Sequence, residues 1–149
     1  MSGDRAHFEH MSTIPHSAAL GMEFLSMVDG VCEVKISYAD HLVGDPDTGV
    51  IHGGAITALM DNASGFAARP VGETGDTIGI ATLDMRIDYM GPAVPGRDVI
   101  ARARCVKRTR NVAFVRTEAY QDDPDDPIAM CTATFMIGTR NTARDGAQS

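Results

Sequence analysis

The 149-residue sequence contains no tryptophan, and its other aromatic side chains are limited to five phenylalanines and three tyrosines. Methionine is common, with nine copies, and 44% of the residues are hydrophobic. The chain can therefore bury a sizeable core, but that core must be largely aliphatic, with methionine filling irregular gaps. A chain of this length fits one domain.

Cysteine is scarce, and its three copies lie far apart at Cys32, Cys105 and Cys131. No Cys-x-x-Cys pair occurs, so the spacing argues against a disulfide framework and against a zinc site. We expect reduced, buried thiols of the kind found in cytosolic proteins.

Positive charge is in short supply, because 13 lysines and arginines stand against 20 aspartates and glutamates, for a formal net charge of −7. Nucleic-acid binding usually needs a basic face, so the composition argues against DNA or RNA as a partner. An anionic ligand needs only a local basic patch. The densest basic cluster is Lys107-Arg108-Thr109-Arg110, although such a run is usually a solvated turn.

Long apolar runs are missing as well. No stretch approaches the ~20 residues needed to cross a membrane. The N-terminal sequence MSGDRAHFEHMS also lacks the apolar region of a signal peptide. We therefore predict a soluble, cytoplasmic protein with no membrane partner.

The chain divides into an N-terminal segment over 1–20, one domain over 21–139 and a polar tail over 140–149 that we expect to be disordered. A short helix is possible over 1–11. In the domain, two extended runs at 22–28 and 31–38 flank Asp29-Gly30, a dipeptide that predicts a hairpin. The Asp-, Gly- and Pro-rich stretch 39–50 is predicted to be a long loop.

One long helix is predicted over 53–68, where apolar residues recur at helical spacing before Pro70 and Gly72 end the pattern. Four strands are predicted after it, at about 80–90, 97–108, 111–121 and 127–138. In the first of them Leu83, Met85, Ile87 and Tyr89 alternate with Thr82, Asp84, Arg86 and Asp88.

This element order predicts an α+β fold in which a long antiparallel sheet wraps around one central helix. One helix cannot cover both faces of such a sheet, so the pattern also predicts an oligomer.

The segment that carries candidate chemistry is Thr48–Asp61, in which His52 precedes Gly53-Gly54 at the start of the helix. The first N–H groups of a helix lack internal partners and favour negative charge, so an oxyanion would be stabilised there. Asp61 follows two turns later in an otherwise apolar or small-residue helix and could act as general base or nucleophile. Taken singly, each feature has a plain interpretation: a turn for His-Gly-Gly, a solvated residue for Asp61.

The order of the motifs resembles the hotdog-fold thioesterases of the phenylacetyl-CoA thioesterase type. The matching pieces are Gly49–Gly54 (GVIHGG), Ala58–Asp61 (ALMD), the strand Thr82–Tyr89 followed by Met90-Gly91-Pro92-Ala93, and Arg110–Phe114 (RNVAF). The resemblance covers about residues 20–138 and implies hydrolysis of an acyl-CoA to the free acid and CoA, without a metal or cofactor. It also implies a homodimer or a dimer of dimers with shared active sites.

The resemblance assigns roles to residues of this chain. Gly53 corresponds to the backbone donor that polarises the thioester carbonyl, His52 to the residue that shapes the loop before it, and Asp61 to the catalytic acid. Thr82 corresponds to a hydroxyl residue that helps to place the attacking water. Substrate contacts are expected from Asp45, Gly54, Lys107, Arg108, Arg110 and Asn111.

Two positions depart from the family pattern. Many relatives carry Asn or Gln six or seven residues before the histidine, where this chain has Pro46 and Asp45. Relatives also often have glycine where this chain has Thr109. Two other functions stay open at this point: a non-catalytic acyl-CoA binder or sensor, and a hotdog acyl-thioester dehydratase, although the dehydratase motif is not found.

Overall fold

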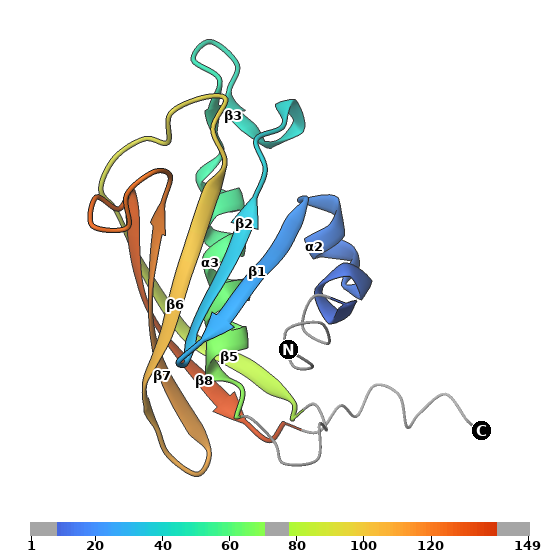
Figure 1. Ribbon diagram of the computed structural model, residues 1–149, viewed down its shortest axis with the longest axis vertical. Coiled ribbons are helices and arrows are strands. Elements are labelled where there is room, and N and C mark those ends of the chain that lie inside the picture. The colour runs from blue at the N-terminus through green and yellow to red at the C-terminus, as the bar shows by residue number, and fades with distance from the viewer. Residues whose placement is uncertain (1–8, 71–77, 140–149) are drawn as a thin grey trace, which may run out of the picture.

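The computed structural model describes residues 9–70 and 78–139. A six-stranded antiparallel sheet in the order β1-β2-β6-β7-β8-β5 curves around one long helix (Figure 1). The strands of this sheet are β1 (Met22–Val28), β2 (Val31–Ile36), β5 (Ile80–Tyr89), β6 (Val99–Arg108), β7 (Val112–Tyr120) and β8 (Ala129–Ile137). The helix is α3 (Gly53–Ala68). The α+β architecture predicted from the element order is confirmed.

The β1–β2 hairpin turns at Asp29-Gly30, as predicted. Both residues have positive φ angles, 51° and 76°, which is the backbone conformation that two-residue hairpin loops need and that Asp-Gly tolerates. β2 then pairs with β6, and this pairing joins the N-terminal hairpin to the C-terminal strands.

The core lies between α3 and the concave face of the sheet. Small side chains on the inward positions of the strands let the helix approach closely; they include Ala101, Ala103, Ala113, Ala119, Ala129 and Ala133, all nearly inaccessible to solvent. From α3, Leu59, Met60 and Ala63 are fully buried against them. The one buried polar contact that crosses this interface joins the hydroxyls of Ser64 and Thr117 at 2.7 Å, in the part of the chain described. The prediction of an aliphatic core, with methionine in it, is confirmed.

The edge strand β5 departs from the strict alternation that the sequence predicts. A bulge between Thr82 and Asp84 shifts its register against β8. As a result Thr82 pairs with buried Phe135 and faces inward, together with Met85 and Ile87 beyond the bulge. Leu83, which the alternation groups with Met85 and Ile87, is 53% exposed instead. A bulge places two residues opposite one, so the inward face changes at that point.

The stretch 39–50 is more ordered than a plain loop. It contains a single 3₁₀ turn, η1 (Asp40–Leu42), and the strand β3 (Val43–Asp45), which pairs with β4 (Val50–Ile51) just before α3. The sequence does not indicate these elements, because strands of two or three residues are too short to show an alternating pattern.

The N-terminal segment packs onto the domain. Residues 9–13 are helical and α2 (Pro15–Ala19) follows. Met11 and Ser17 are buried, and the amide of Asn62 on α3 donates to the Ser17 hydroxyl at 2.8 Å. The possible helix over 1–11 falls partly outside the described residues, and the tail over 140–149, predicted to be disordered, falls wholly outside them.

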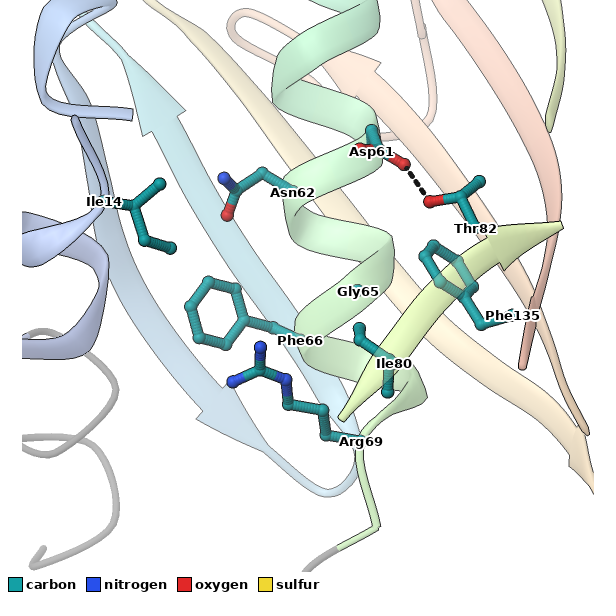
Figure 2. Close-up of a pocket in the computed structure, with 9 residues that line it drawn as sticks. All are labelled: Ile14, Asp61, Asn62, Gly65, Phe66, Arg69, Ile80, Thr82 and Phe135. Atoms are coloured by element: carbon teal, nitrogen blue, oxygen red, sulfur yellow. Dashed lines mark hydrogen bonds between the residues drawn. The ribbon is translucent and has the colours of Figure 1, made fainter. Parts of the chain in front are cut away.

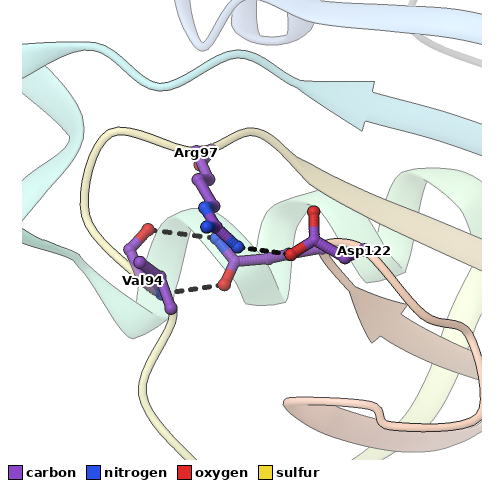
Figure 3. A network of polar contacts seen from close by, with 4 residues as sticks. Val94, Arg97 and Asp122 are labelled. Atoms are coloured by element: carbon purple, nitrogen blue, oxygen red, sulfur yellow. Dashed lines mark hydrogen bonds and ion pairs between the residues drawn. The ribbon is translucent and has the colours of Figure 1, made fainter.

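Polar contacts hold the long connection between β5 and β6 against the end of β7 (Figure 3). The Gln121 side chain accepts from the Val94 N–H at 2.8 Å and donates to its carbonyl at 3.1 Å, while Arg97 pairs with Asp122. The middle and the C-terminal part of this connection are therefore held in place, although Gly91-Pro92 and Pro95-Gly96 make it turn-rich.

The convex face of the sheet is uncovered in the single chain, and large apolar side chains are exposed there and along β5. They include Leu83, Tyr89, Met90, Val94, Val106, Phe114 and Met130. Within the described ranges, no helix has both the length and the apolar character to span a membrane.

Candidate active site at the helix α3

His52 and two glycines build the start of α3. The His52 N–H donates to the Leu42 carbonyl, and the His52 carbonyl accepts from the Ala55 N–H. Its ring Nδ1 accepts from the Gly54 N–H at 2.8 Å and so caps the helix. The neutral ring then carries its proton on Nε2. Gly53, the first helical residue, keeps an N–H with no hydrogen-bond partner among the described residues.

Glycine is needed at two places for this arrangement. A Cβ at Gly54 would lie 2.8 Å from His52 Nδ1, and a Cβ at Gly44 would lie 2.8 Å from the His52 Cα. Both distances are shorter than real contacts, so β3 and the helix start close tightly around His52. The predicted role of His52 in shaping this loop is thus consistent with its contacts.

Tyr89 holds the same helix end from the sheet side. Its hydroxyl donates to the Gly53 carbonyl at 2.8 Å and shares a hydrogen bond with the Thr57 hydroxyl. Tyr89 belongs to the alternating pattern predicted for this strand, and no function was predicted for it. No local sequence signal indicates this role, because it depends on a tertiary contact between the end of β5 and the start of α3.

Asp61 and Thr82, predicted separately, are brought together. The Thr82 hydroxyl donates to Asp61 Oδ1 at 2.9 Å. Both residues line a hollow of about 210 Å³ beside α3, and Figure 2 shows their contact at one end of it. The hollow is also lined by Ile14, Asn62, Gly65, Phe66, Arg69, Ile80 and Phe135, none of which the sequence analysis singled out.

Cys131 interacts electrostatically with Asp61. Burial, and secondarily the Asp61 carboxylate, raises the pKa of the Cys131 thiol to about 11. The thiolate is the nucleophilic form of cysteine, so Cys131 stays protonated and unreactive near neutral pH. The assignment of the chemistry to Asp61 stays a prediction.

Gly53 and Asp61 cannot act on one carbonyl group within one chain. They are eight residues apart on α3, which corresponds to about 12 Å along a helix axis. A reacting carbonyl must lie about 3 Å from both its hydrogen-bond donor and the attacking group. The geometry of the single chain supplies the two halves of a site at two separate places.

Asp45 lies on β3, opposite Val50 of the strand that leads into α3. Its carboxylate accepts from the Asp47 N–H at 3.0 Å and from the Thr48 hydroxyl at 2.9 Å, and these bonds, the Thr48 contact first, lower the pKa of Asp45. The side chain is exposed and does not line the hollow that contains Asp61. Its assignment as a substrate contact stays a prediction.

The basic turn at 107–111 lies at the other end of α3. Arg108 donates to the carbonyls of Ala67, Ala68 and Arg69 at 3.1–3.4 Å and so caps the C-terminus of the helix. Lys107 and Arg110 are exposed. Of the three basic residues predicted to hold substrate, Arg108 therefore has a structural use, and the other two remain available.

The described residues contain no group of three or more His, Cys, Asp or Glu side chains that could hold a metal ion. The predicted catalytic groups are the carboxylate of Asp61, the hydroxyl of Thr82 and the N–H of Gly53.

Comparison with known proteins places the chain in a family. The family model of the thioesterase superfamily matches residues 48–128, a range that includes the start of α3, Asp61, Thr82 and the basic turn. The chain belongs to the thioesterase superfamily. It is accordingly a thioester hydrolase, with the hotdog fold that the resemblance implied.

Individual relatives narrow the family. The chain is 28% identical to the medium/long-chain acyl-CoA thioesterase YigI of Escherichia coli K12, over 84% of this chain and 86% of that protein. A Pseudomonas aeruginosa protein superposes with a TM-score of 0.78 at 38% identity, over 89% of this chain and 97% of that one. A variant of the phenylacetic acid degradation protein PaaI of Thermus thermophilus superposes with a TM-score of 0.68 at 30% identity, over 82% and 97%. The prediction of a PaaI-like thioesterase is confirmed.

Proposed function

We propose that this thioesterase hydrolyses an acyl-CoA to the free acid and CoA, with Asp61 as general base or nucleophile and the Gly53 N–H as the donor to the thioester carbonyl. The observation that carries the proposal is the half-buried Asp61 carboxylate, fixed by the Thr82 hydroxyl at the end of a hollow on α3. YigI, which resembles this chain over most of its length, is named for the same reaction.

The chemistry follows from the two helix positions. The thioester carbonyl oxygen accepts from the Gly53 N–H, where the positive end of the α3 dipole stabilises the charge that develops on it. Asp61 either removes a proton from water as the water attacks the carbonyl carbon or attacks that carbon itself. The tetrahedral intermediate then collapses, the C–S bond breaks, and CoA leaves as a thiolate that takes up a proton. By the second route, water must afterwards hydrolyse the mixed anhydride on Asp61.

Thr82 and Tyr89 are positioning residues in this proposal. The Thr82 hydroxyl holds Asp61 Oδ1 and leaves Oδ2 for water or substrate. The Tyr89 hydroxyl binds the Gly53 carbonyl and so fixes the first peptide unit of α3. Neither side chain needs to exchange a proton with the substrate.

A complete site requires two chains. Because Gly53 and Asp61 lie about 12 Å apart along α3, we infer that Gly53 of one subunit and Asp61 of the other meet across a homodimer interface. The outer edge of β5 has no strand partner among the described residues, and β5 and its continuation expose Leu83, Tyr89, Met90 and Val94. An uncovered, apolar edge strand is a surface that a second copy can extend.

The substrate is held at both ends in this proposal. The acyl group enters the hollow beside Asp61, and the exposed Lys107 and Arg110 supply cations for the CoA phosphates in a protein whose net charge is −7. A cytoplasmic location, where CoA thioesters are made and used, fits this assignment.

A substrate panel tests the proposal. Aryl-, short-, medium- and long-chain acyl-CoAs are incubated with the enzyme, and the free thiol is measured with a thiol reagent. We expect turnover of at least one class, and light scattering should give a dimer or tetramer of the 15.9 kDa chain. Binding without hydrolysis across the whole panel would favour the sensor hypothesis, and an active monomer would contradict the shared site.

A further inference from the structure

Arg69 closes the far end of the hollow that begins at Asp61. It follows the last residue of α3 and lines the same cavity, two helical turns from Asp61 on the same face, with Gly65 between them. Figure 2 shows Asp61 and Thr82 at one end of the cavity and the Arg69 guanidinium at the other.

The Arg69 guanidinium lacks a counter-ion in the described part of the chain. It lies over the Phe66 ring, 5.6 Å from the centroid, and its Nε is buried without a hydrogen-bond partner among the described residues. Burial lowers the pKa of Arg69, and no charged neighbour offsets this effect. A cation that is partly buried without a compensating anion is costly, so such a group is usually kept for a ligand or a partner.

The wall between the two polar ends is mostly apolar. Four apolar side chains, Phe66, Ile80, Phe135 and Ile14, form most of it, and a Cβ at Gly65 would come within 3.1 Å of the Ile80 side chain. Among the described residues, the one polar side chain in the lining between Asp61 and Arg69 is Asn62, whose amide donates to Ser17. A ligand that fits this cavity has a reactive group at one end, a hydrocarbon or aromatic middle, and an acceptor for a guanidinium at the other end.

We propose that Arg69 selects acyl groups that end in a carboxylate, so that the preferred substrates are CoA thioesters of dicarboxylic acids. This inference rests on the proposed function, because it assumes that the thioester carbonyl is placed beside Asp61. A terminal carboxylate accepts charge-assisted hydrogen bonds from Arg69. The terminal methyl of a plain fatty acyl group leaves the guanidinium unpaired in the cavity.

Matched substrates of equal chain length test the proposal without any mutation. Adipyl-, suberyl- and sebacyl-CoA are compared with hexanoyl-, octanoyl- and decanoyl-CoA. We expect the wild-type kcat/KM to favour the carboxylated member of at least one pair by about 10- to 100-fold, the range for a hydrogen bond to a charged group. Equal or better turnover of the plain acyl group in every pair would overturn the proposal.

Variants assign the preference to Arg69. Arg69→Met should abolish the ratio between suberyl- and octanoyl-CoA, and Arg69→Lys, which keeps the charge but not the forked geometry, should retain part of it. Arg116→Met is the matched control, because Arg116 is exposed on the convex face and pairs across the sheet with Arg104 and Thr132; it should keep the wild-type ratio. A wild-type ratio in Arg69→Met would overturn the assignment.

The design separates this inference from two other outcomes. If Arg69 binds CoA phosphate instead, Arg69→Met raises KM equally for all thioesters and leaves the kcat/KM ratio of suberyl- to octanoyl-CoA intact. Suberyl- and octanoyl-pantetheine lack the nucleotide, so in that case the variant and the wild type hydrolyse them equally well. If no thioester is hydrolysed at all, the proposed function fails. Hydrolysis of plain acyl-CoAs without discrimination contradicts the Arg69 proposal alone.

Discussion

The two ends of α3 differ in how their unpaired backbone groups are used. At the C-terminal end, the Arg108 guanidinium donates to three successive carbonyls, Ala67 to Arg69. At the N-terminal end, His52 and Tyr89 bind the groups around Gly53, but the Gly53 N–H itself has no partner in the described structure. Every helix begins with unpaired N–H groups and ends with unpaired carbonyls. In this molecule the end that stays open is the one next to the candidate chemistry.

Side chains at the two ends of α3 are therefore expected to affect different properties, stability at the C-terminal end and catalysis at the N-terminal end. A side chain that satisfies the backbone contributes to the free energy of folding, whereas one that holds an unsatisfied donor in place contributes to transition-state binding. Substitutions at the two ends should therefore affect different measurements.

The largest effect is expected from Asp61→Asn, midway along the helix. The amide has nearly the size of the carboxylate and can still accept from the Thr82 hydroxyl, so the fold and the oligomer should persist. It cannot take a proton from water or attack a carbonyl, and kcat should fall by about 10²–10⁴. Single-turnover and steady-state assays on the best panel substrate measure this change.

Asp84→Asn is the matched control for that variant. Asp84 is exposed on β5, directly beyond the bulge that turns Thr82 inward, so the same chemical change should leave kcat unaltered. An Asp61→Asn enzyme that keeps more than about a tenth of wild-type kcat would remove Asp61 from the mechanism, since loss of a general base costs more than that.

Arg108→Ala tests the closed end. Three carbonyls lose their donor, and the free energy of unfolding should fall by about 1–3 kcal/mol, the usual cost of leaving polar groups unsatisfied. Chemical denaturation measures this, with Arg104→Ala, an exposed change on the same strand, as control. Unchanged stability with a raised KM would instead support the substrate-binding role that the family resemblance assigns to Arg108. The C-terminal end of α3 would then also take part in function.

Tyr89→Phe tests the open end and removes only a hydroxyl. The Gly53 carbonyl and Thr57 lose a hydrogen bond, the first peptide unit of α3 gains freedom, and kcat should fall about tenfold with little change in KM, which corresponds to one net hydrogen bond. Tyr120→Phe is the control, since the Tyr120 hydroxyl binds Glu33 on the sheet and has no hydrogen bond to α3 among the described residues. Equal kcat values for the two variants would contradict a positioning role for Tyr89.

The sequence predicted α3 and the β1–β2 hairpin well, because both have strong local signals. The 53–68 periodicity coincides with Gly53–Ala68, and Asp29-Gly30 has the positive φ angles that its composition favours. The sequence predicted β5 less well. Its bulge depends on the pairing with β8 and cannot be recognised from the alternation of apolar and polar residues. The candidate role of Thr82 came from the family resemblance, because the alternating pattern placed it on the opposite face from Met85.

The site was predicted in part for a similar reason. His52, Gly53 and Asp61 lie within one segment, so their relation follows from helix geometry. Tyr89 and Arg69 gain their meaning only from tertiary contacts with Gly53 and Phe66. A lone arginine after a helix, or a tyrosine on a strand, is too common a feature to indicate a function from sequence alone.

The smallest effect is expected at the basic turn beyond the closed end of α3. Arg110 is exposed there and makes no ion pair among the described residues, while the protein as a whole is acidic. Arg110→Ala should raise KM about three- to fivefold and leave kcat nearly unchanged, because an exposed charge contributes about 1 kcal/mol or less. The difference from wild type should shrink as salt is raised, since salt screens exposed charges. Arg97→Ala, which removes an exposed arginine held by Asp122 near the opposite end of β6, should leave KM unchanged. Equal KM values for wild type and Arg110→Ala at low salt would move the CoA contact to Lys107 or to the partner subunit.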